Sequence, residues 1–180
     1  MPKTTTDTPD IRKNPLWVFC DGGLGGGAQA EEEQSTRAAW RKYFREERVC
    51  TAAAVARNRR GQILDWRWQR LTHGSNNEAE YAGLLLGLEI GLAHGATALT
   101  CVMDSEVVVG QMRGYFHVNS AELRQWHWRA CALARRLPHV RFCLVPREWN
   151  HLADGLAGQA MMPWRGLMNA IEAFNAEIFT

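Results

Sequence analysis

The hydrophobic pattern of the first 70 residues predicts three strands. Residues 16–20 are an apolar run of strand-forming side chains that ends at Asp21 and a glycine-rich stretch, which is typical of a strand followed by a tight loop. Residues 49–56 form a second apolar run. Residues 64–69 alternate between apolar and polar positions, and a period of two indicates a half-exposed antiparallel strand.

A long helix is predicted to begin after Ser75. Ser75 and Glu78 have the spacing of a capping box, in which each side chain bonds the backbone N–H of the other residue. The predicted apolar stripe consists of Tyr81, Leu84, Leu85, Leu88 and Leu92. Glycine recurs every fourth residue at Gly83, Gly87 and Gly91. Each glycine costs roughly 1 kcal/mol of helix propensity relative to alanine, so the row indicates close approach to another backbone.

The second half of the chain alternates between strands and helices. Residues 99–103 predict a fourth strand that ends at Asp104, and residues 140–145 predict a fifth. Asn150 is expected to cap a helix that runs to about Met162. Further helices are predicted over residues 105–112 and 121–137. A strand meander followed by this alternation predicts an α/β fold, with a five-stranded mixed sheet, its first three strands antiparallel, and helices packed on it.

Composition is that of a globular protein. The chain has 180 residues, 46% hydrophobic and 22% charged, and a net charge of +2, which excludes a strongly cationic coat but not a local basic groove. Its five cysteines include no C-x-x-C pair, so we expect reduced thiols and no zinc site. No apolar segment looks like a signal peptide or a membrane span. We therefore expect a cytoplasmic protein without membrane contact.

Four acidic residues occupy positions that packing explains poorly. Asp21 and Asp104 close strands, Glu80 lies in the first turns of the long helix, and Asp154 lies one turn into the last helix of the sheet domain. Any one of them alone is more simply read as a surface charge or a helix cap. Together they indicate convergence at one edge of the sheet, where loops gather and ligands usually bind.

Four segments resemble the type 1 ribonuclease H family in order and in the element that carries each one. They are residues 19–23 (FCDGG), 75–81 (SNNEAEY), 104–105 (DS) and 147–157 (REWNHLADGLA). The resemblance covers about residues 15–160, and its motif style is closest to archaeal-type and related bacterial members. It implies the ribonuclease H-like fold and an endonuclease that cuts the RNA strand of an RNA–DNA hybrid.

The resemblance also implies a catalytic centre made of Asp21, Glu80, Asp104 and Asp154. These carboxylates would hold two Mg²⁺ ions, with Mn²⁺ as a possible substitute, and oxygen-only ligands suit both metals. Asp21 would bridge the ions, Asp154 would complete the water-activating site, and Glu80 and Asp104 would serve the leaving-group side. The register of the second motif selects Glu80 rather than Glu78.

Substrate-binding residues follow from the same resemblance. Gly22, Asn76 and Asn77 match positions that read the 2′-hydroxyl groups of RNA, although the Asn pair also suits a helix start. Arg147 is a candidate phosphate contact. His151, one helical turn before Asp154, is either an auxiliary residue that assists product release or a solvent-exposed side chain.

The chain departs from the family at several places. The loop after Asp21 contains only glycine and leucine, and Glu106 stands where many members have glutamine. Trp126 and Trp128 fall on a predicted helix, where we expect core packing. Two alternatives therefore stay open: a hybrid-binding module with weakened catalysis, and a DNA-directed nuclease of the same superfamily.

The sequence divides into a domain with appendages. Residues 15–162 form the predicted ribonuclease H domain, within which residues 28–48 are interpreted as an insertion. Residues 1–14 are polar and read as a flexible tail. Residues 163–180 carry an amphipathic stripe and predict a separate helix that docks on the domain or on a partner. We expect a monomer whose main partner is an RNA–DNA hybrid.

Overall fold

A computed structural model describes residues 14–24, 50–72 and 74–160 of the chain. The predicted N-terminal tail (apart from Asn14), the predicted insertion at 28–48 and the predicted C-terminal helix at 163–180 lie outside the described residues. The described residues contain no helix long and apolar enough to cross a membrane.

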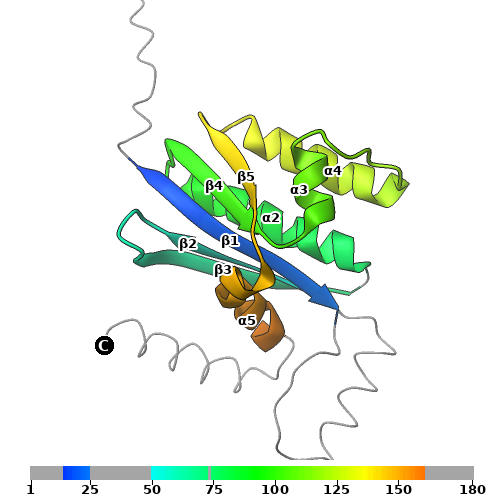
Figure 1. The fold of residues 1–180 in the computed structure, drawn as a ribbon, viewed down its shortest axis with the longest axis horizontal. Coiled ribbons are helices and arrows are strands. Elements are labelled where there is room, and N and C mark those ends of the chain that lie inside the picture. Colours follow the sequence, from blue (N-terminus) through cyan, green and yellow to red (C-terminus); the bar gives the residue numbers. More distant parts are fainter. Residues whose placement is uncertain (1–13, 25–49, 73, 161–180) are drawn as a thin grey trace, which may run out of the picture.

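The centre of the fold is a five-stranded mixed sheet with the order β3-β2-β1-β4-β5 (Figure 1). The strands are β1 (Pro15–Leu24), β2 (Cys50–Arg57), β3 (Ile63–Leu71), β4 (Ala98–Met103) and β5 (Val140–Leu144). β1, β2 and β3 pair antiparallel, whereas β1–β4 and β4–β5 pair parallel. The predicted fold class, including the antiparallel first three strands, is therefore confirmed.

Helices cover both faces of this sheet. The helices are α2 (Asn76–Ala93), α3 (Glu106–Met112), α4 (Ala121–Ala134) and α5 (His151–Ala160), and a 3₁₀ turn spans Arg147–Trp149. α2 packs on β1 and β2, and α4 packs on α2. α5 packs on β1, β2 and β3 from the opposite face (Figure 1). Strand geometry allows helices to pack on both faces of the sheet, because successive side chains such as those of Phe19 and Cys20 point to opposite sides.

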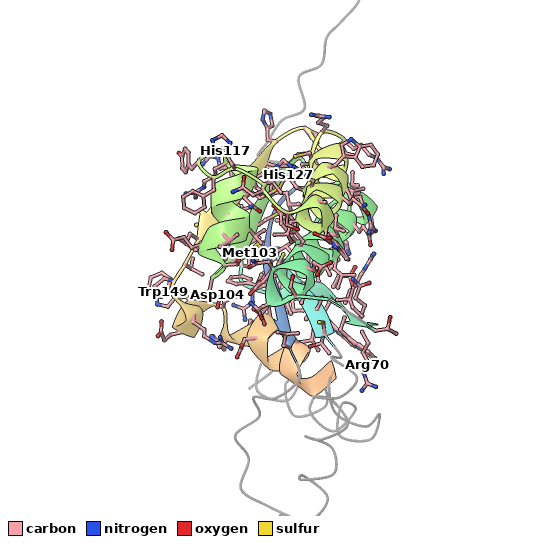
Figure 2. All side chains as sticks on the ribbon, turned by 90° about the vertical axis from the view of Figure 1, so that its right-hand side faces the viewer. Arg70, Met103, Asp104, His117, His127 and Trp149 are labelled. Carbon is pink, nitrogen blue, oxygen red and sulfur yellow. The ribbon has the colours of Figure 1, made fainter. Side chains whose placement is uncertain are left out.

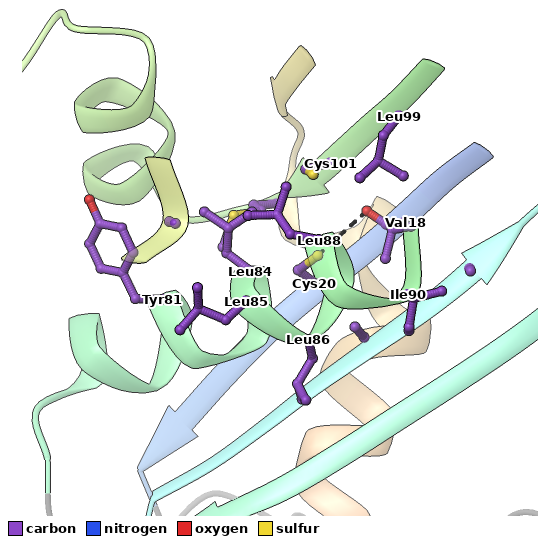
Figure 3. Packing of buried hydrophobic residues seen from close by; sticks show 14 of the residues in the cluster. Val18, Cys20, Tyr81, Leu84, Leu85, Leu86, Leu88, Ile90, Leu99 and Cys101 are labelled. Atoms are coloured by element: carbon purple, nitrogen blue, oxygen red, sulfur yellow. Dashed lines mark hydrogen bonds between the residues drawn. The ribbon is translucent and has the colours of Figure 1, made fainter. Parts of the chain in front are cut away.

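The main core lies between α2 and the sheet. Figure 3 shows Leu84 and Leu88 of α2 against Val18 and Cys20 of β1, and all four are fully buried. Burial raises the pKa of the Cys101 thiol to about 12, so this cysteine behaves as a small apolar side chain. All five cysteines are free, as the sequence predicted.

The glycine row of α2 explains how closely this helix approaches β1. A Cβ on Gly83 would lie 2.3 Å from the carbonyl oxygen of Asp21, and one on Gly87 would lie 2.5 Å from the Cys20 sulfur. Both distances are too short for a real Cβ contact, so the predicted close approach to another backbone is confirmed at Gly83, and at Gly87 the helix packs directly on the Cys20 side chain. The helix begins with the predicted capping box: Ser75 N–H donates to Glu78 Oε2 at 2.7 Å, and Ser75 Oγ accepts from Glu78 N–H.

The tryptophans of α4 differ from the expectation of core packing. Trp126 packs against the core and its Nε1–H donates to Glu78 Oε1 at 3.2 Å, which ties α4 to the start of α2. Trp128 is 68% exposed, so the expectation is wrong for this residue. Because the two residues are two positions apart, about 200° around the helix, they cannot share a buried face.

Candidate active site beside β1 at the end of β4

Asp21 and Asp104 lie at the same level of two neighbouring parallel strands. The β1–β4 register pairs Phe19 with Val102, and continuing it by two residues places Asp21 beside Asp104. β4 ends at Met103, whereas β1 continues to Leu24 along β2. The prediction that the first strand ends at Asp21 was therefore wrong, because Gly22 and Gly23 still pair with Ala52 and Thr51. The acids lie where β1 has lost one of its two neighbours.

Glu80 reaches the same place from α2. The main chain of Gly22 lies directly against that of Ala79, the residue before Glu80, so strand and helix touch here without an intervening side chain. Glu80 is 7% exposed and Asp21 is 6% exposed. Glu80 Oε2 is buried and has no hydrogen-bond partner in the described part of the chain. A buried, unpartnered carboxylate oxygen is costly unless a proton or a cation compensates it.

The pKa values of both buried acids reflect this crowding. Burial, followed by the charges of Asp104 and Asp154, raises the pKa of Asp21 to about 7. Burial, followed by the charges of Asp21 and Asp104, raises the pKa of Glu80 to about 9. Arg147 and the backbone N–H of Gly22 oppose both shifts. Asp21 therefore lies within electrostatic reach of the other three predicted acids, and the raised pKa values favour the protonated form of Glu80 at neutral pH and partial protonation of Asp21.

The Asp154 side chain forms an ion pair with an arginine of the same chain. Arg147, in the 3₁₀ turn before α5, donates to Asp154 Oδ1 in an ion pair. The Arg147 side chain is 73% exposed and that of Asp154 is 36% exposed, so the pair lies at the surface. Asp154, the nearest of the acids, raises the pKa of Arg147.

The four acids are neighbours, but their carboxylates do not form a set of metal ligands in the described residues. Among residues 14–24, 50–72 and 74–160, no group of three or more His, Cys, Asp or Glu side chains is arranged to hold a metal ion. Asp154 is paired with Arg147 instead. The donor set nevertheless fits Mg²⁺ or Mn²⁺, because it is made of carboxylates and includes the unpartnered Glu80 Oε2.

The predicted substrate-binding residues surround these acids. Asn76 is exposed and Asn77 half-buried, and they precede Glu80 by four and three residues, so all three lie on adjoining positions of α2. Gly22 follows Asp21, and a Cβ there would lie 2.0 Å from the carbonyl carbon of Ala79, so packing alone requires glycine. His151 is exposed, and its Nδ1 lies 3.1 Å from the Glu148 carbonyl oxygen.

Sequence reasoning missed the role of the Asn150 side chain. Its backbone oxygen accepts from Asp154 N–H at 3.1 Å, as expected at a helix start. The side chain, however, caps nothing: Nδ2 donates to Cys20 O at 2.9 Å and to Asp104 Oδ1 at 2.7 Å. Asparagine before a helix is so common as a cap that the sequence offered no separate signal for this tertiary role.

The chain thus forms a ribonuclease H fold with a cluster of acidic side chains at one end of its sheet. The N-terminal ribonuclease H domain of Rv2228c from Mycobacterium tuberculosis, solved as a fusion with maltose-binding protein, superposes with a TM-score of 0.67 at 30% identity, covering 82% of this chain and 99% of that one. Residues 37–160 match the family described as "Reverse transcriptase-like". The chain belongs to this family.

One curated relative and several solved structures carry ribonuclease H names. The bifunctional protein Rv2228c of M. tuberculosis is 40% identical over 93 residues, which are 52% of this chain and 26% of that protein. "Ribonuclease HI" of Halobacterium salinarum is 33% identical over 87 residues, 48% of this chain and 44% of that protein. LC11-RNase H1, solved in complex with an RNA/DNA hybrid, has a TM-score of 0.64 at 22% identity and covers 81% of this chain and 96% of that one. The matched stretches thus span less than half of the two curated relatives.

Proposed function

We propose that this protein is a metal-dependent endonuclease that hydrolyses the RNA strand of RNA–DNA hybrids. One observation carries the proposal: Asp21 and Glu80 are buried side by side with raised pKa values, next to Asp104 and Asp154. A protein gains no stability from such mutually repelling acids, whereas a centre that binds cations needs them. The ribonuclease H names of the relatives and the hybrid bound in the LC11-RNase H1 structure support the substrate class.

Asp21, Glu80, Asp104 and Asp154 would hold two Mg²⁺ ions, with Mn²⁺ as a substitute. Asp21 lies centrally, since its pKa responds to both Asp104 and Asp154, which suits a bridging ligand. Bound divalent ions supply an activated water and a stabilised leaving oxygen for phosphodiester hydrolysis. Asp154 would serve the water-activating side, and Glu80 and Asp104 the leaving-group side.

The protein's own groups prepare this centre. At neutral pH without a bound cation, Glu80 with its pKa of about 9 keeps its proton and Asp21 with its pKa of about 7 is partly protonated; both must be deprotonated to act as ligands. Arg147 neutralises Asp154 meanwhile. The guanidinium has five donors, so one edge can stay on Asp154 while another contacts a phosphate of the substrate.

Selection of RNA would come from contacts to 2′-hydroxyl groups. Asn76 and Asn77 lie within one helical turn of Glu80, and the Gly22 backbone lies beside Asp21, so all three can meet a sugar near the cleaved bond. His151 is exposed one turn before Asp154, where it can assist product release. A cytoplasmic location and a monomeric state remain predictions.

A comparison of substrates tests the proposal. Labelled RNA–DNA hybrid, duplex DNA and duplex RNA are incubated with the full chain in Mg²⁺ or Mn²⁺. We expect internal cleavage of the RNA strand in the hybrid alone, and its loss in Asp21→Asn and Asp104→Asn. Cleavage of duplex DNA would instead support a DNA-directed nuclease, and unchanged turnover in both variants would reject the assigned acids.

One observation favours a second function, a hybrid-binding module with weakened catalysis. Asp154 is paired with Arg147, and no group of three acids closes into a metal site within the described ranges. Tight binding of the hybrid without cleavage at any concentration of Mg²⁺ or Mn²⁺ would establish this function in place of hydrolysis.

A further inference from the structure

Asn150 is a fully buried polar side chain at the junction of the 3₁₀ turn and α5. One donor of its side-chain amide bonds the carbonyl oxygen of Cys20, the residue directly before Asp21. The same nitrogen donates to the carboxylate of Asp104. In Figure 2, Asp104 and Trp149, the neighbour of Asn150, are labelled next to each other at the left side of the fold. A single amide nitrogen therefore joins Cys20 within β1, the residue after β4 and the start of α5.

This arrangement is not that of a helix cap. A cap accepts hydrogen bonds from the first-turn N–H groups through a side-chain oxygen, but Asn150 Oδ1 has no hydrogen-bond partner in the described part of the chain. The amide uses both of its N–H donors on two different elements and leaves its oxygen unpaired. A buried unpaired oxygen is costly, so the asparagine is explained by its two donated hydrogen bonds and not by helix capping.

We propose that Asn150 is a positioning residue, which fixes the relative placement of Asp21, Asp104 and Asp154 and thereby tunes the affinity of this centre for divalent cations. The inference rests on the proposed function. Asn150 holds Asp104 directly, Asp21 through the Cys20 carbonyl, and Asp154 through α5, whose first turn begins at His151. A short, buried link of this kind can be made by asparagine but not by the longer glutamine without displacing β1 or β4.

Substitution of Asn150 should change the affinity for the metal ion rather than the affinity for the substrate. Asn150 is buried and touches no reacting group, so it acts only through the carboxylates. Loss of an outer hydrogen bond to a metal ligand typically weakens metal affinity by about 10–100-fold. We therefore expect Asn150→Ala to bind Mn²⁺ about tenfold or more weakly, to lower kcat at a fixed Mn²⁺ concentration, and to leave KM for the hybrid within about twofold.

The test measures Mn²⁺ binding to the full chain by titration calorimetry without any substrate, beside thermal melting. Gln111→Ala is the matched control. Gln111 is another buried side-chain amide with two hydrogen bonds, to the Tyr81 hydroxyl at 2.8 Å and the His117 carbonyl at 3.1 Å, and neither partner is a carboxylate. Both variants should melt at lower temperature, but only Asn150→Ala should lose Mn²⁺ affinity. Equal Mn²⁺ affinity in Asn150→Ala and the parent overturns the proposal.

Asn150→Ser covers the case in which Asn150→Ala does not fold. The serine hydroxyl keeps one donor and can satisfy only one of the two acceptors, so the proposal expects a smaller loss of Mn²⁺ affinity, and parental affinity would again overturn it. Failure of the proposed function looks different, because then the parent itself neither binds Mn²⁺ nor cleaves a hybrid. If the parent binds Mn²⁺ and cleaves the hybrid, and the Asn150 variants bind Mn²⁺ as tightly as the parent, only the inference about Asn150 is rejected.

Discussion

Gly22 and Ala79 are in direct backbone contact, and this contact places Glu80 beside Asp21. A Cβ on Gly22 would lie 2.0 Å from the carbonyl carbon of Ala79 and 2.4 Å from the Glu80 nitrogen. Backbone atoms cannot move aside as a flexible side chain can. The glycine therefore sets how near the first turns of α2 come to β1, and with it the separation of the two buried acids.

Gly22→Ala is expected to destabilise the protein and to abolish hydrolysis of the hybrid. The added methyl forces α2 away from β1, and overpacking of this kind costs about 1–3 kcal/mol or more. At roughly 2–4 °C per kcal/mol for a chain of this size, melting followed by circular dichroism should show a drop of several degrees, with no substrate present.

Gly158→Ala is the control for this substitution. A Cβ on Gly158 in α5 would meet nothing within 4 Å, and alanine is favoured over glycine in a helix by about 1 kcal/mol. It should leave activity unchanged and melt at the same or a slightly higher temperature. If Gly22→Ala melts like the parent and loses only hybrid binding, Gly22 acts in substrate binding and not in the packing of α2 against β1.

The sequence predicted those features whose cause is local. The capping box at Ser75 and Glu78 formed because its two partners are three residues apart in one chain segment. The glycine row of α2 predicted close backbone contact because a repeated loss of helix propensity needs a compensating gain. The five strands followed from runs and alternation of apolar residues, and their pairing confirmed the predicted mixed sheet.

Features that depend on tertiary contacts escaped prediction. β1 continues through Gly22 and Gly23 because β2 supplies partners that no local pattern reveals. The Asn150 side chain turned to Cys20 and Asp104, more than 40 residues away in the chain, instead of capping α5. The ion pair of Arg147 with Asp154 likewise arises from how the 3₁₀ turn meets α5. Motif spacing placed the acids near one another but could not give their partners.

Glu80→Gln and Glu78→Gln should separate the two glutamates of the second motif. Glu80 is buried among the acids, so losing its charge should reduce kcat by about 100-fold or more, equivalent to roughly 2.7 kcal/mol. Glu78 serves the capping box and accepts from Trp126. Glutamine also completes such a box, so Glu78→Gln should keep activity within about threefold. The reverse ranking, measured by steady-state cleavage of a hybrid, would reassign the catalytic glutamate.

The metal-free protein should lose stability as the pH rises from 5 to 8.5. The pKa of Asp21 rises from 3.8 to about 7 on folding and that of Glu80 from 4.5 to about 9. The folded state therefore binds more protons than the unfolded state in this window. Its stability is greatest below about pH 4, falls between the unfolded and the folded pKa of each acid, and levels off above the folded pKa. Thermal melts in EDTA should drop by several degrees across the window.

Two additions make the pH experiment decisive. Mg²⁺ binds only the deprotonated carboxylates of the folded chain, so it should raise the melting temperature more at pH 8.5 than at pH 5. The double variant Asp21→Asn/Glu80→Gln removes both titrating groups and should flatten the pH dependence in EDTA. A parent melting temperature that is constant or rises between pH 5 and 8.5, with no difference from the double variant, would show that the two acids are not coupled to folding.

Arg147→Ala should weaken hybrid binding while costing little stability. Its ion pair with Asp154 is solvent-exposed, and such pairs contribute about 0–1 kcal/mol. A phosphate contact, in contrast, releases a counterion, and its loss should lower the slope of log K against log salt by about 1. We expect KM for the hybrid to rise about tenfold and the melting temperature to change by no more than about 3 °C. Arg141→Ala is the charge-matched control, because Arg141 on β5 pairs with Thr100 on β4 and lines a cavity with Pro15 and Leu16, away from Asp104. A salt slope that falls equally in both variants would mean that Arg147 acts only through net charge, and an unchanged KM in Arg147→Ala would confine its role to neutralising Asp154.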